Sequence, residues 1–590
     1  MKFRKQTNII NDSKVFILSV IALVALILDF GFKQNYWMHL ITDIFYLLFS
    51  IINSIYFITE FSNKKKFDLS PKGHYLVTTI SFILLIFAAS NTGIFLLTRL
   101  TVLNTYTAGL VFILTIFDLS VRLYRLNHQT MHPALVFALS FAVLICLGTL
   151  VLLTPKATVN GISFLDAFFT STSAVCVTGL AVLDTGKDFT LLGQITIISL
   201  IQLGALGMLS FTSLFALFFK GYGSYGSQLN LKNMINAETL NTTFKTLLQI
   251  LVFVFLVESI GAVLIFLSVD ANSEFFKERL FFSIFHSVSA FCNAGFSTLS
   301  NSLFQEGVRY KFSLHLIIAV LIILGGLGNG VVINIYYYLK KMFLYWQYRL
   351  FDISWQQEKQ KIKPRLGLNT KIVLYSTIIL LILGTGLFYI LEYNNTLKGY
   401  SAIGKLVTSF FGSVTTRTAG FNTVDTGSLS LPTLMVFLFF MWIGASPGST
   451  GGGIKTTTFV VAIFSVAQQA FGYNNIRVGY RNIPRKALQR ASAIITLSIL
   501  VIGFSVFLLI YLDEDLGVMP IIFECFSAFS TVGLSMGITS QFSELGKLVL
   551  IVTMFIGRVG LLTLLTGLMR QIHTYQYSPI EYPEEEILIN

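Results

Sequence analysis

The sequence is poor in charged residues. Asp, Glu, Lys and Arg make up 12% of its 590 residues, and 54% are hydrophobic. Soluble globular chains carry about 25% charged residues. A chain this apolar cannot cover itself with polar side chains in water, so we exclude a soluble enzyme, a nucleic-acid-binding protein and a disordered scaffold. The class that remains is a protein that spans a membrane.

Cysteine and histidine are also scarce. The four cysteines show no spacing typical of a zinc site or a disulfide framework. The seven histidines are scattered, and the pair at ligand spacing, His128 and His132, has no third ligand nearby. An integral-membrane enzyme would need such groups clustered near a membrane face. We therefore expect no enzyme, no cofactor and no metal site other than one for a transported monovalent cation.

Apolar runs of about 20 residues, the length that crosses a hydrocarbon core, recur along the whole chain. They predict twelve transmembrane helices. One of these runs, 431–470, is too long for one plain span and is interrupted near its middle by glycine, serine and threonine. The predicted spans are 15–32, 36–59, 76–98, 105–124, 133–153, 190–219, 243–268, 313–339, 370–391, 431–470, 491–512 and 545–569.

The net charge of +13 has an origin in these connecting segments. If the N-terminus is cytoplasmic, 27 of the 41 Lys and Arg residues lie in segments on the cytoplasmic side. Cytoplasmic loops of membrane proteins carry such an excess. The sequence therefore predicts a multi-pass protein of the cell (plasma or inner) membrane with a cytoplasmic N-terminus, and no nucleic-acid partner.

Four segments between paired spans share one pattern that ends in glycine followed by leucine or phenylalanine. The glycines are Gly179, Gly295, Gly420 and Gly533, separated by 116, 125 and 113 residues. Each segment predicts a short helix and then an extended stretch. A single copy would suggest close helix packing, but four copies at near-equal spacing indicate an internal repeat.

Extended backbone at membrane depth is stable only where protein buries it or water wets it. We therefore expect the four loops to meet on one axis, where rings of backbone carbonyls replace the hydration shell of a small monovalent cation. Glycine permits a positive φ or a close approach of the backbone to the ion. The predicted cation-binding residues are Val177, Thr178, Gly179, Asn293, Ala294, Gly295, Thr418, Ala419, Gly420, Thr531, Val532 and Gly533.

A second unusual stretch, 451–455, interrupts the long apolar run with three glycines, Ile454 and Lys455. A phosphate-binding loop needs lysine directly after glycine and a strand before it, so we assign no nucleotide site here. The glycines and Pro447 cannot hold a straight helix. Two interpretations remain: backbone that lies across a cavity, or a kink packed against a neighbouring helix.

Arg558 lies in the middle of an apolar span, where an arginine costs at least about 2.5 kcal/mol and needs a cavity or a partner. Glu258 and Asp118 are carboxylates that could pair with it.

These motifs resemble those of the Trk/Ktr/HKT superfamily of potassium transporters, and of Ktr-type membrane subunits in particular, over residues 130–575. The resemblance implies a pseudo-fourfold pore in one chain, a homodimer, and a cytoplasmic nucleotide-binding ring subunit that opens a gate. The gate residues it implies are Gly451, Gly452, Gly453, Lys455 and Arg558. It also implies that Arg558 faces the pore below the filter, where its charge raises the barrier to cations and its side chain helps to hold the loop that contains Lys455. Glycine rather than serine at position 179 implies selectivity for potassium.

The leading hypothesis is potassium uptake through a carbonyl-lined selectivity filter, channel-like and gated from the cytoplasmic side. A sodium-permeable or sodium-coupled monovalent cation transporter is the alternative. The predicted fold class is an all-α polytopic membrane protein with four helix–pore-loop–helix repeats in pseudo-fourfold arrangement. The predicted organisation is a four-helix extension (1–130), repeat 1 (131–242), repeat 2 (243–368), repeat 3 with the gating loop (369–486), repeat 4 (487–575) and a cytoplasmic tail (576–590).

The extension departs from the typical Ktr-type subunit. A voltage sensor would need arginines at every third position of its fourth helix, and that helix has only Arg122 and Arg125 at its end. A role in packing or assembly is the other interpretation.

Overall fold

The computed structural model describes residues 18–29, 31–33, 36–62, 111, 133–207, 243–269, 278–350, 366–472, 476–478 and 481–572. Across these ranges the regular structure is helical apart from one two-residue hairpin of β1 (Arg477–Val478) and β2 (Arg481–Asn482). The predicted all-α class is confirmed. The predicted span 76–98, nearly all of 105–124, the pair His128 and His132, and the tail 576–590 lie outside the described residues.

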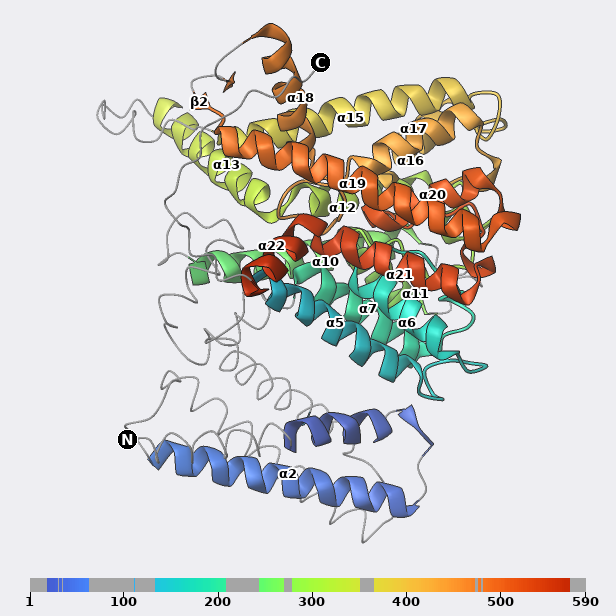
Figure 1. The fold of residues 1–590 in the computed structure, drawn as a ribbon. Coiled ribbons are helices and arrows are strands. Elements are labelled where there is room, and N and C mark those ends of the chain that lie inside the picture. The colour runs from blue at the N-terminus through green and yellow to red at the C-terminus, as the bar shows by residue number, and fades with distance from the viewer. Residues whose placement is uncertain are drawn as a thin grey trace.

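Four units with one order of elements follow each other from residue 133 to residue 572 (Figure 1). Each unit consists of a long helix, a short helix, a loop and a further helical region. The elements are α5 (Pro133–Leu152), α6 (Phe164–Val175) and α7 (Leu191–Leu206) in unit 1; α10 (Thr243–Ser268), α11 (Arg279–Phe291), α12 (Phe312–Leu327) and α13 (Asn329–Leu350) in unit 2; α15 (Leu368–Glu392), α16 (Ala402–Thr415), α17 (Leu431–Trp442) and α18 (Thr456–Phe471) in unit 3; and α19 (Arg485–Leu512), α20 (Val518–Ser530), α21 (Glu544–Val559) and α22 (Leu561–Ile572) in unit 4.

The short helices α6, α11, α16 and α20 contain 12 to 14 residues. At 1.5 Å per residue they extend about 20 Å, which is too short to cross a hydrocarbon core. Serine caps begin two of them: Ser163 Oγ accepts from the N–H of Asp166, and Ser401 Oγ accepts from that of Gly404. Their C-terminal ends are buried, so these helices end inside the molecule.

Two predicted continuous spans are broken. The run at 313–339 bends by 99° between α12 and α13, and the run at 545–569 bends by 80° between α21 and α22. Gly328 and Gly560 stand at the two breaks with φ of 83° and 85°, a conformation that a helix interior does not contain. The expected interruption of 431–470 is present, between α17 and α18.

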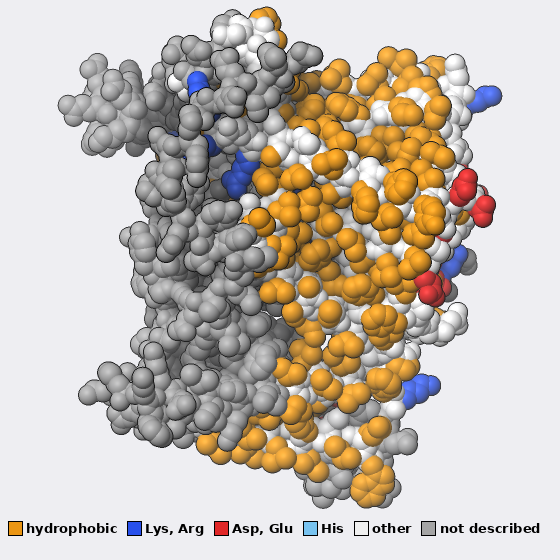
Figure 2. Space-filling model, in the orientation of Figure 1, with side chains coloured by type: hydrophobic (Ala, Val, Ile, Leu, Met, Phe, Trp, Pro, Cys, Tyr) orange, Lys and Arg blue, Asp and Glu red, His pale blue; other side chains and the backbone are white. Residues whose placement is uncertain are grey.

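The surface of this bundle is apolar. Figure 2 shows hydrophobic side chains over most of the described face, with charged side chains near its edges. Among the described residues three helices are long and apolar enough to cross a membrane, or five if each bent pair counts as one span. Large exposed hydrophobic side chains on these helices, such as Ile382 and Phe507, are stable against lipid and not against water.

The described part of the N-terminal region consists of a helix, Leu18–Asp29, and α2 (Tyr36–Ser62), which lie beside each other (Figure 1). The buried hydroxyl of Tyr46 donates to Asp29 Oδ2 at 3.0 Å and joins the two helices. Gly31 O accepts from the N–H of Lys156 at 3.0 Å, so this region contacts unit 1 just after α5.

Candidate functional site

Each short helix leads into a three-residue stretch that we call a glycine loop: loop 1 is 177–179, loop 2 is 293–295, loop 3 is 418–420 and loop 4 is 531–533. In every loop the first residue and the glycine have a positive φ, and the middle residue does not. The angles are 58° and 94° for Val177 and Gly179, 60° and 71° for Asn293 and Gly295, 68° and 80° for Thr418 and Gly420, and 50° and 87° for Thr531 and Gly533. A β-branched residue rarely adopts a positive φ. Strain of this kind, repeated four times, is typical of a functional site.

The four glycine loops touch in a closed ring. A Cβ built on Gly179 would lie closer than 3.0 Å to the carbonyl oxygen of Ala294 in loop 2. The same overlap occurs from Gly295 to Ala419, from Gly420 to Val532 and from Gly533 to Thr178. The ring therefore runs 1–2–3–4 in chain order and returns to loop 1, with loops 1 and 3 opposite each other and loops 2 and 4 opposite each other. No side chain larger than that of glycine fits at these four positions.

A hydroxyl near the end of each short helix fixes its own glycine loop. The residues are Ser173, Ser289, Thr415 and Ser527. In loops 1 and 4 the hydroxyl accepts from the N–H of the glycine, at 3.1 and 3.0 Å. In loops 2 and 3 it donates to the carbonyl of the phenylalanine after the glycine, at 2.7 and 2.5 Å. The repeat contained these hydroxyls, but the sequence alone gave no reason to assign them a role.

In unit 3 the segment from this hydroxyl to the glycine is one residue shorter than in the other units. Its hydroxyl, on Thr415, lies five residues before the glycine, whereas Ser173, Ser289 and Ser527 lie six residues before theirs. The N–H of Ala419 accordingly bonds the carbonyl four residues back, while the middle residues of the other loops bond the carbonyl five residues back. An ungapped alignment of the four copies hides this difference.

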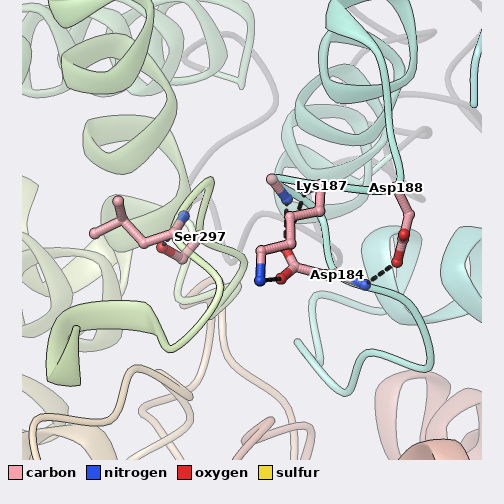
Figure 3. A network of polar contacts seen from close by, with 6 residues as sticks. Asp184, Lys187, Asp188 and Ser297 are labelled. Atoms are coloured by element: carbon pink, nitrogen blue, oxygen red, sulfur yellow. Dashed lines mark hydrogen bonds and ion pairs between the residues drawn. The ribbon is translucent and has the colours of Figure 1, made fainter. Parts of the chain in front are cut away.

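A hollow of about 330 Å³ opens in front of the ring. The glycines of all four glycine loops line it, together with residues that follow them, including Asp184, Ser297 and Ser535. Figure 3 shows Asp184 and Ser297 on facing segments of units 1 and 2. The Asp184 carboxylate accepts from the N–H groups of Gly186 and Lys187 at 2.8 and 3.2 Å, which fixes the shape of its loop.

Helix C-termini surround the other side of the ring. The four short helices end three to five residues before their glycines. The C-terminal end of a helix carries a partial negative charge from its unpaired carbonyls. Four such ends around one ring of backbone favour a cation there.

Residues 443–455, which we call the bridging segment, lie against the ring on the side away from the hollow. Its two ends pair in a parallel bridge between Ile443 and Ile454. The N–H of Gly452 donates to Thr531 Oγ1 in loop 4 at 2.9 Å, and Thr450 Oγ1 lies 3.4 Å from the Asn293 side chain of loop 2. Ser446 Oγ donates to Gly326 O of α12 at 2.8 Å. The segment therefore contacts two loops of the ring as well as α12, and is not a kink packed against a neighbouring helix alone.

Two basic side chains hold the bridging segment. Lys455 Nζ donates to the carbonyls of Gly451 and Gly452 at 2.5 and 3.5 Å. Arg558, in α21, donates to the carbonyl of Thr450 and to that of Gly204 at the end of α7, the latter at 2.8 Å. Four of the predicted gate residues thus lie in the bridging segment, and the fifth, Arg558, is hydrogen-bonded to it.

The expected carboxylate partners of Arg558 do not account for it. Glu258 contacts Gln202 Nε2 at 3.2 Å and Cys292 Sγ at 3.7 Å instead, and within the described ranges no ion pair joins it to Arg558. Asp118 lies outside those ranges. Backbone carbonyls satisfy the guanidinium, because the ends of α7 and of the bridging segment leave carbonyls without helical partners.

The fold and the site define the class: an all-α polytopic membrane protein in which four glycine loops contact one another in a ring. The chain matches the family described as TrkH, cation transport protein, over residues 126–574. It therefore belongs to the TrkH family of cation transport proteins, which confirms the resemblance in its motifs, and it is a transport protein rather than an enzyme.

Individual transport proteins are also similar to this chain. The Ktr system potassium uptake protein B of Bacillus subtilis is 34% identical, over 77% of this chain and 96% of its own length. The potassium/sodium uptake protein NtpJ of Enterococcus hirae is 36% identical, over 78% and 98%. The crystal structure of the potassium transporter TrkH from Vibrio parahaemolyticus superposes with a TM-score of 0.57 at 19% identity, over 83% of this chain and 96% of that one, and so shares its fold.

Proposed function

We propose that this chain takes up potassium across the cell membrane, and that the four glycine loops are its selectivity filter. The closed ring of loops with alternating signs of φ carries the proposal. Alternation of this kind turns successive carbonyl oxygens toward one side of the chain, where they can replace the hydration shell of a monovalent cation. Potassium is the ion in the names of the relatives from Bacillus subtilis and Enterococcus hirae.

The bridging segment is the proposed gate. It contacts loops 2 and 4 from below, and Lys455 and Arg558 hold it there. A cation that leaves the ring on this side meets both the segment and two fixed positive charges, which raise its barrier. Transport then requires that the segment move aside.

The assembly we propose follows the resemblance of the motifs. The chain is a homodimer in the cell membrane, with its N-terminus in the cytoplasm, and a cytoplasmic nucleotide-binding ring subunit displaces the bridging segment. The excess of Lys and Arg in the segments assigned to the cytoplasm supports this orientation.

Sodium permeation or sodium coupling is the second candidate. The name of the relative from Enterococcus hirae includes both ions. The middle residues of the loops (Thr178, Ala294, Ala419 and Val532) are not all alike, and in unit 3 the segment from Thr415 to the glycine is one residue shorter than its counterparts. Carbonyl rings built from unlike loops select less strictly than rings of four identical loops.

The test is potassium-dependent growth of a bacterial strain without its own uptake systems, expressing this chain together with a ring subunit. Rescue at low potassium supports the proposal. A chain that reaches the membrane and carries sodium but not potassium supports the second candidate. A chain that carries neither ion with any ring subunit overturns both.

A further inference from the structure

Two buried polar side chains lie behind opposite loops of the ring. His286 in α11 and Glu524 in α20 each stand nine residues before the filter glycine of their unit. Both side chains are fully buried, with no exposed surface. Neither belongs to a glycine loop or to the bridging segment.

His286 holds the residue that follows loop 2. Its Nδ1 lies 2.9 Å from the carbonyl of Phe282, which can only accept, so Nδ1 carries a proton. Its Nε2 lies 2.9 Å from Ser297 Oγ. Ser297 Oγ also accepts from the N–H of Leu299 at 3.0 Å, which leaves its own proton for Nε2. The imidazole is therefore an acceptor for this hydroxyl.

Glu524 makes the equivalent contact behind loop 4. The hydroxyl of Ser535 donates to Glu524 Oε1, and Thr539 Oγ1 lies 3.1 Å from the same oxygen. Ser535 Oγ accepts from the N–H of Gly537 at 2.9 Å. Both serines stand two residues after the filter glycine, and each is bound by an N–H two residues further on and by an acceptor on its own short helix.

Units 1 and 3 lack both partners of this contact. At the equivalent position, unit 1 has Thr170, whose hydroxyl has no hydrogen-bond partner among the described residues. Unit 3 has Phe411 nine residues before the glycine and, when its shorter segment is taken into account, Gly412; neither residue has a side chain that can accept a hydrogen bond. Two residues after the glycine these units have Ala181 and Asn422. A buried acceptor and the serine that it binds therefore occur together in units 2 and 4, which face each other across the ring. Units 1 and 3, which form the other opposite pair, have neither.

The two serines line the hollow in front of the ring. Each is separated from its filter glycine by one residue, so its position constrains where the carbonyls of that loop point. We propose that His286 and Glu524 are positioning residues, which through Ser297 and Ser535 hold loops 2 and 4 at the ion-selecting geometry and so determine the preference for potassium over sodium. This inference rests on the proposed function of the ring.

The experiment measures potassium and sodium uptake separately in proteoliposomes that contain the full chain and its ring subunit. Ser535→Ala and Ser297→Ala remove the hydroxyl and leave the short helices intact. We expect each to lower the potassium-to-sodium uptake ratio about tenfold, the effect of losing one hydrogen bond to a buried acceptor. Thr170→Val, at the matching position of unit 1, is the control and is expected to leave the ratio unchanged.

The acceptors are tested by conservative and non-conservative pairs. Glu524→Gln retains an acceptor oxygen and is expected to keep the ratio within about twofold, whereas Glu524→Leu is expected to lower it as Ser535→Ala does. The double variant Glu524→Leu with Ser535→Ala is expected to have the same potassium-to-sodium uptake ratio as either single variant, since each substitution removes the same contact.

The outcomes separate this inference from the proposed function. If the wild-type chain carries neither ion, the proposed function fails. If the wild-type chain carries potassium and the two serine variants carry it at an unchanged ratio, the inference is overturned. A fall in uptake rate with an unchanged ratio also overturns it, because a purely structural role lowers the amount of active protein and not its selectivity. If Glu524→Leu does not reach the membrane, the ratios of Ser297→Ala and Ser535→Ala alone test the inference.

Discussion

Gly452 and Thr531 are joined across 79 residues of sequence by a hydrogen bond of 2.9 Å from the N–H of Gly452 to Thr531 Oγ1. Thr531 is the first residue of loop 4, so a hydrogen bond joins the proposed gate directly to the proposed filter. A conformational change in either one alters the surroundings of the other.

Thr531→Val removes the acceptor of this bond and keeps the shape of the side chain. The N–H of Gly452 is then buried without a partner, at a cost of about 1–3 kcal/mol to the docked bridging segment. We expect a higher rate of potassium uptake without activation by the ring subunit, measured as flux into proteoliposomes. Thr170→Val is the control, because the Thr170 hydroxyl has no hydrogen-bond partner in the described part of the chain and the residue lies outside the glycine loops and the bridging segment. Equal rates in the two variants would contradict a role for this bond in gating.

Arg558→Gln removes a fixed positive charge and the contacts with Thr450 O and Gly204 O. Both changes favour passage of a cation, so we expect uptake to rise about tenfold in the absence of the ring subunit. Arg558→Lys separates the two effects, since it keeps the charge and loses the forked guanidinium. Uptake in Arg558→Lys that equals wild type would assign the effect to charge alone, and a fall in uptake in Arg558→Gln would contradict the prediction.

Gly295→Ser adds a side chain where φ is 71° and where a Cβ would overlap the carbonyl of Ala419. Displacement of loops 2 and 3 is expected to lower the potassium-to-sodium uptake ratio about tenfold, given the cost of strain at such positions. Gly386→Ala in α15 is the control, because a Cβ at Gly386 meets no atom within 4 Å. Growth at low potassium checks both variants. Intact growth with an unchanged uptake ratio in Gly295→Ser would contradict the assignment of loop 2 to the filter.

Lys547 in α21 and Asp166 in α6 form an ion pair of 2.7 Å between the last unit and the first. The side chains are only 13% and 20% exposed, so solvent screens the pair incompletely. We expect Asp166→Asn to lower the free energy of unfolding by about 1 kcal/mol. Thermal unfolding in detergent of both single variants and of the double variant with Lys547→Gln measures the coupling. Additive effects would mean that the contact contributes nothing to closure of the ring.

Glu392 ends α15 and is fully buried. Its carboxylate accepts from the hydroxyls of Ser430, Thr433 and Thr396, and from the N–H of Ser430 at 2.9 Å. Glu392→Ala leaves these donors without a partner, and we expect a loss of about 3 kcal/mol in the free energy of unfolding. Glu544→Ala, at an exposed acidic residue in the first turn of α21, is expected to change it by less than about 0.5 kcal/mol. Equal melting temperatures in the two variants would contradict this.

The sequence predicted the four loops because their pattern is local and repeated. Glycine is required wherever two loops meet, so the ring is encoded as four glycines at near-equal spacing. The breaks at Gly328 and Gly560 were missed because hydropathy continues through them and glycine alone does not end a transmembrane helix. At Gly328 a tertiary contact determines the break: the N–H of Asn329 donates to Gly448 O of the bridging segment at 3.1 Å.

The contacts of Arg558 and Glu524 could not be predicted for a related reason. Both residues bind groups distant in sequence, or groups whose orientation depends on the loop that carries them. Sequence alone identified Arg558 as a side chain in need of a cavity or a partner and left a carboxylate such as Glu258 as one alternative, but it could not show that backbone carbonyls of Thr450 and Gly204 satisfy it. The boundaries of the repeats and of the N-terminal extension stay predictions.

The closed contact of loop 4 with loop 1 has a genetic consequence. One gene encodes all four quadrants of the ring, so a point mutation alters one quadrant and leaves three unchanged. In an assembly of four identical chains the same mutation would alter every quadrant at once. The proposed filter can therefore change in small steps, with each quadrant free to diverge under separate selection.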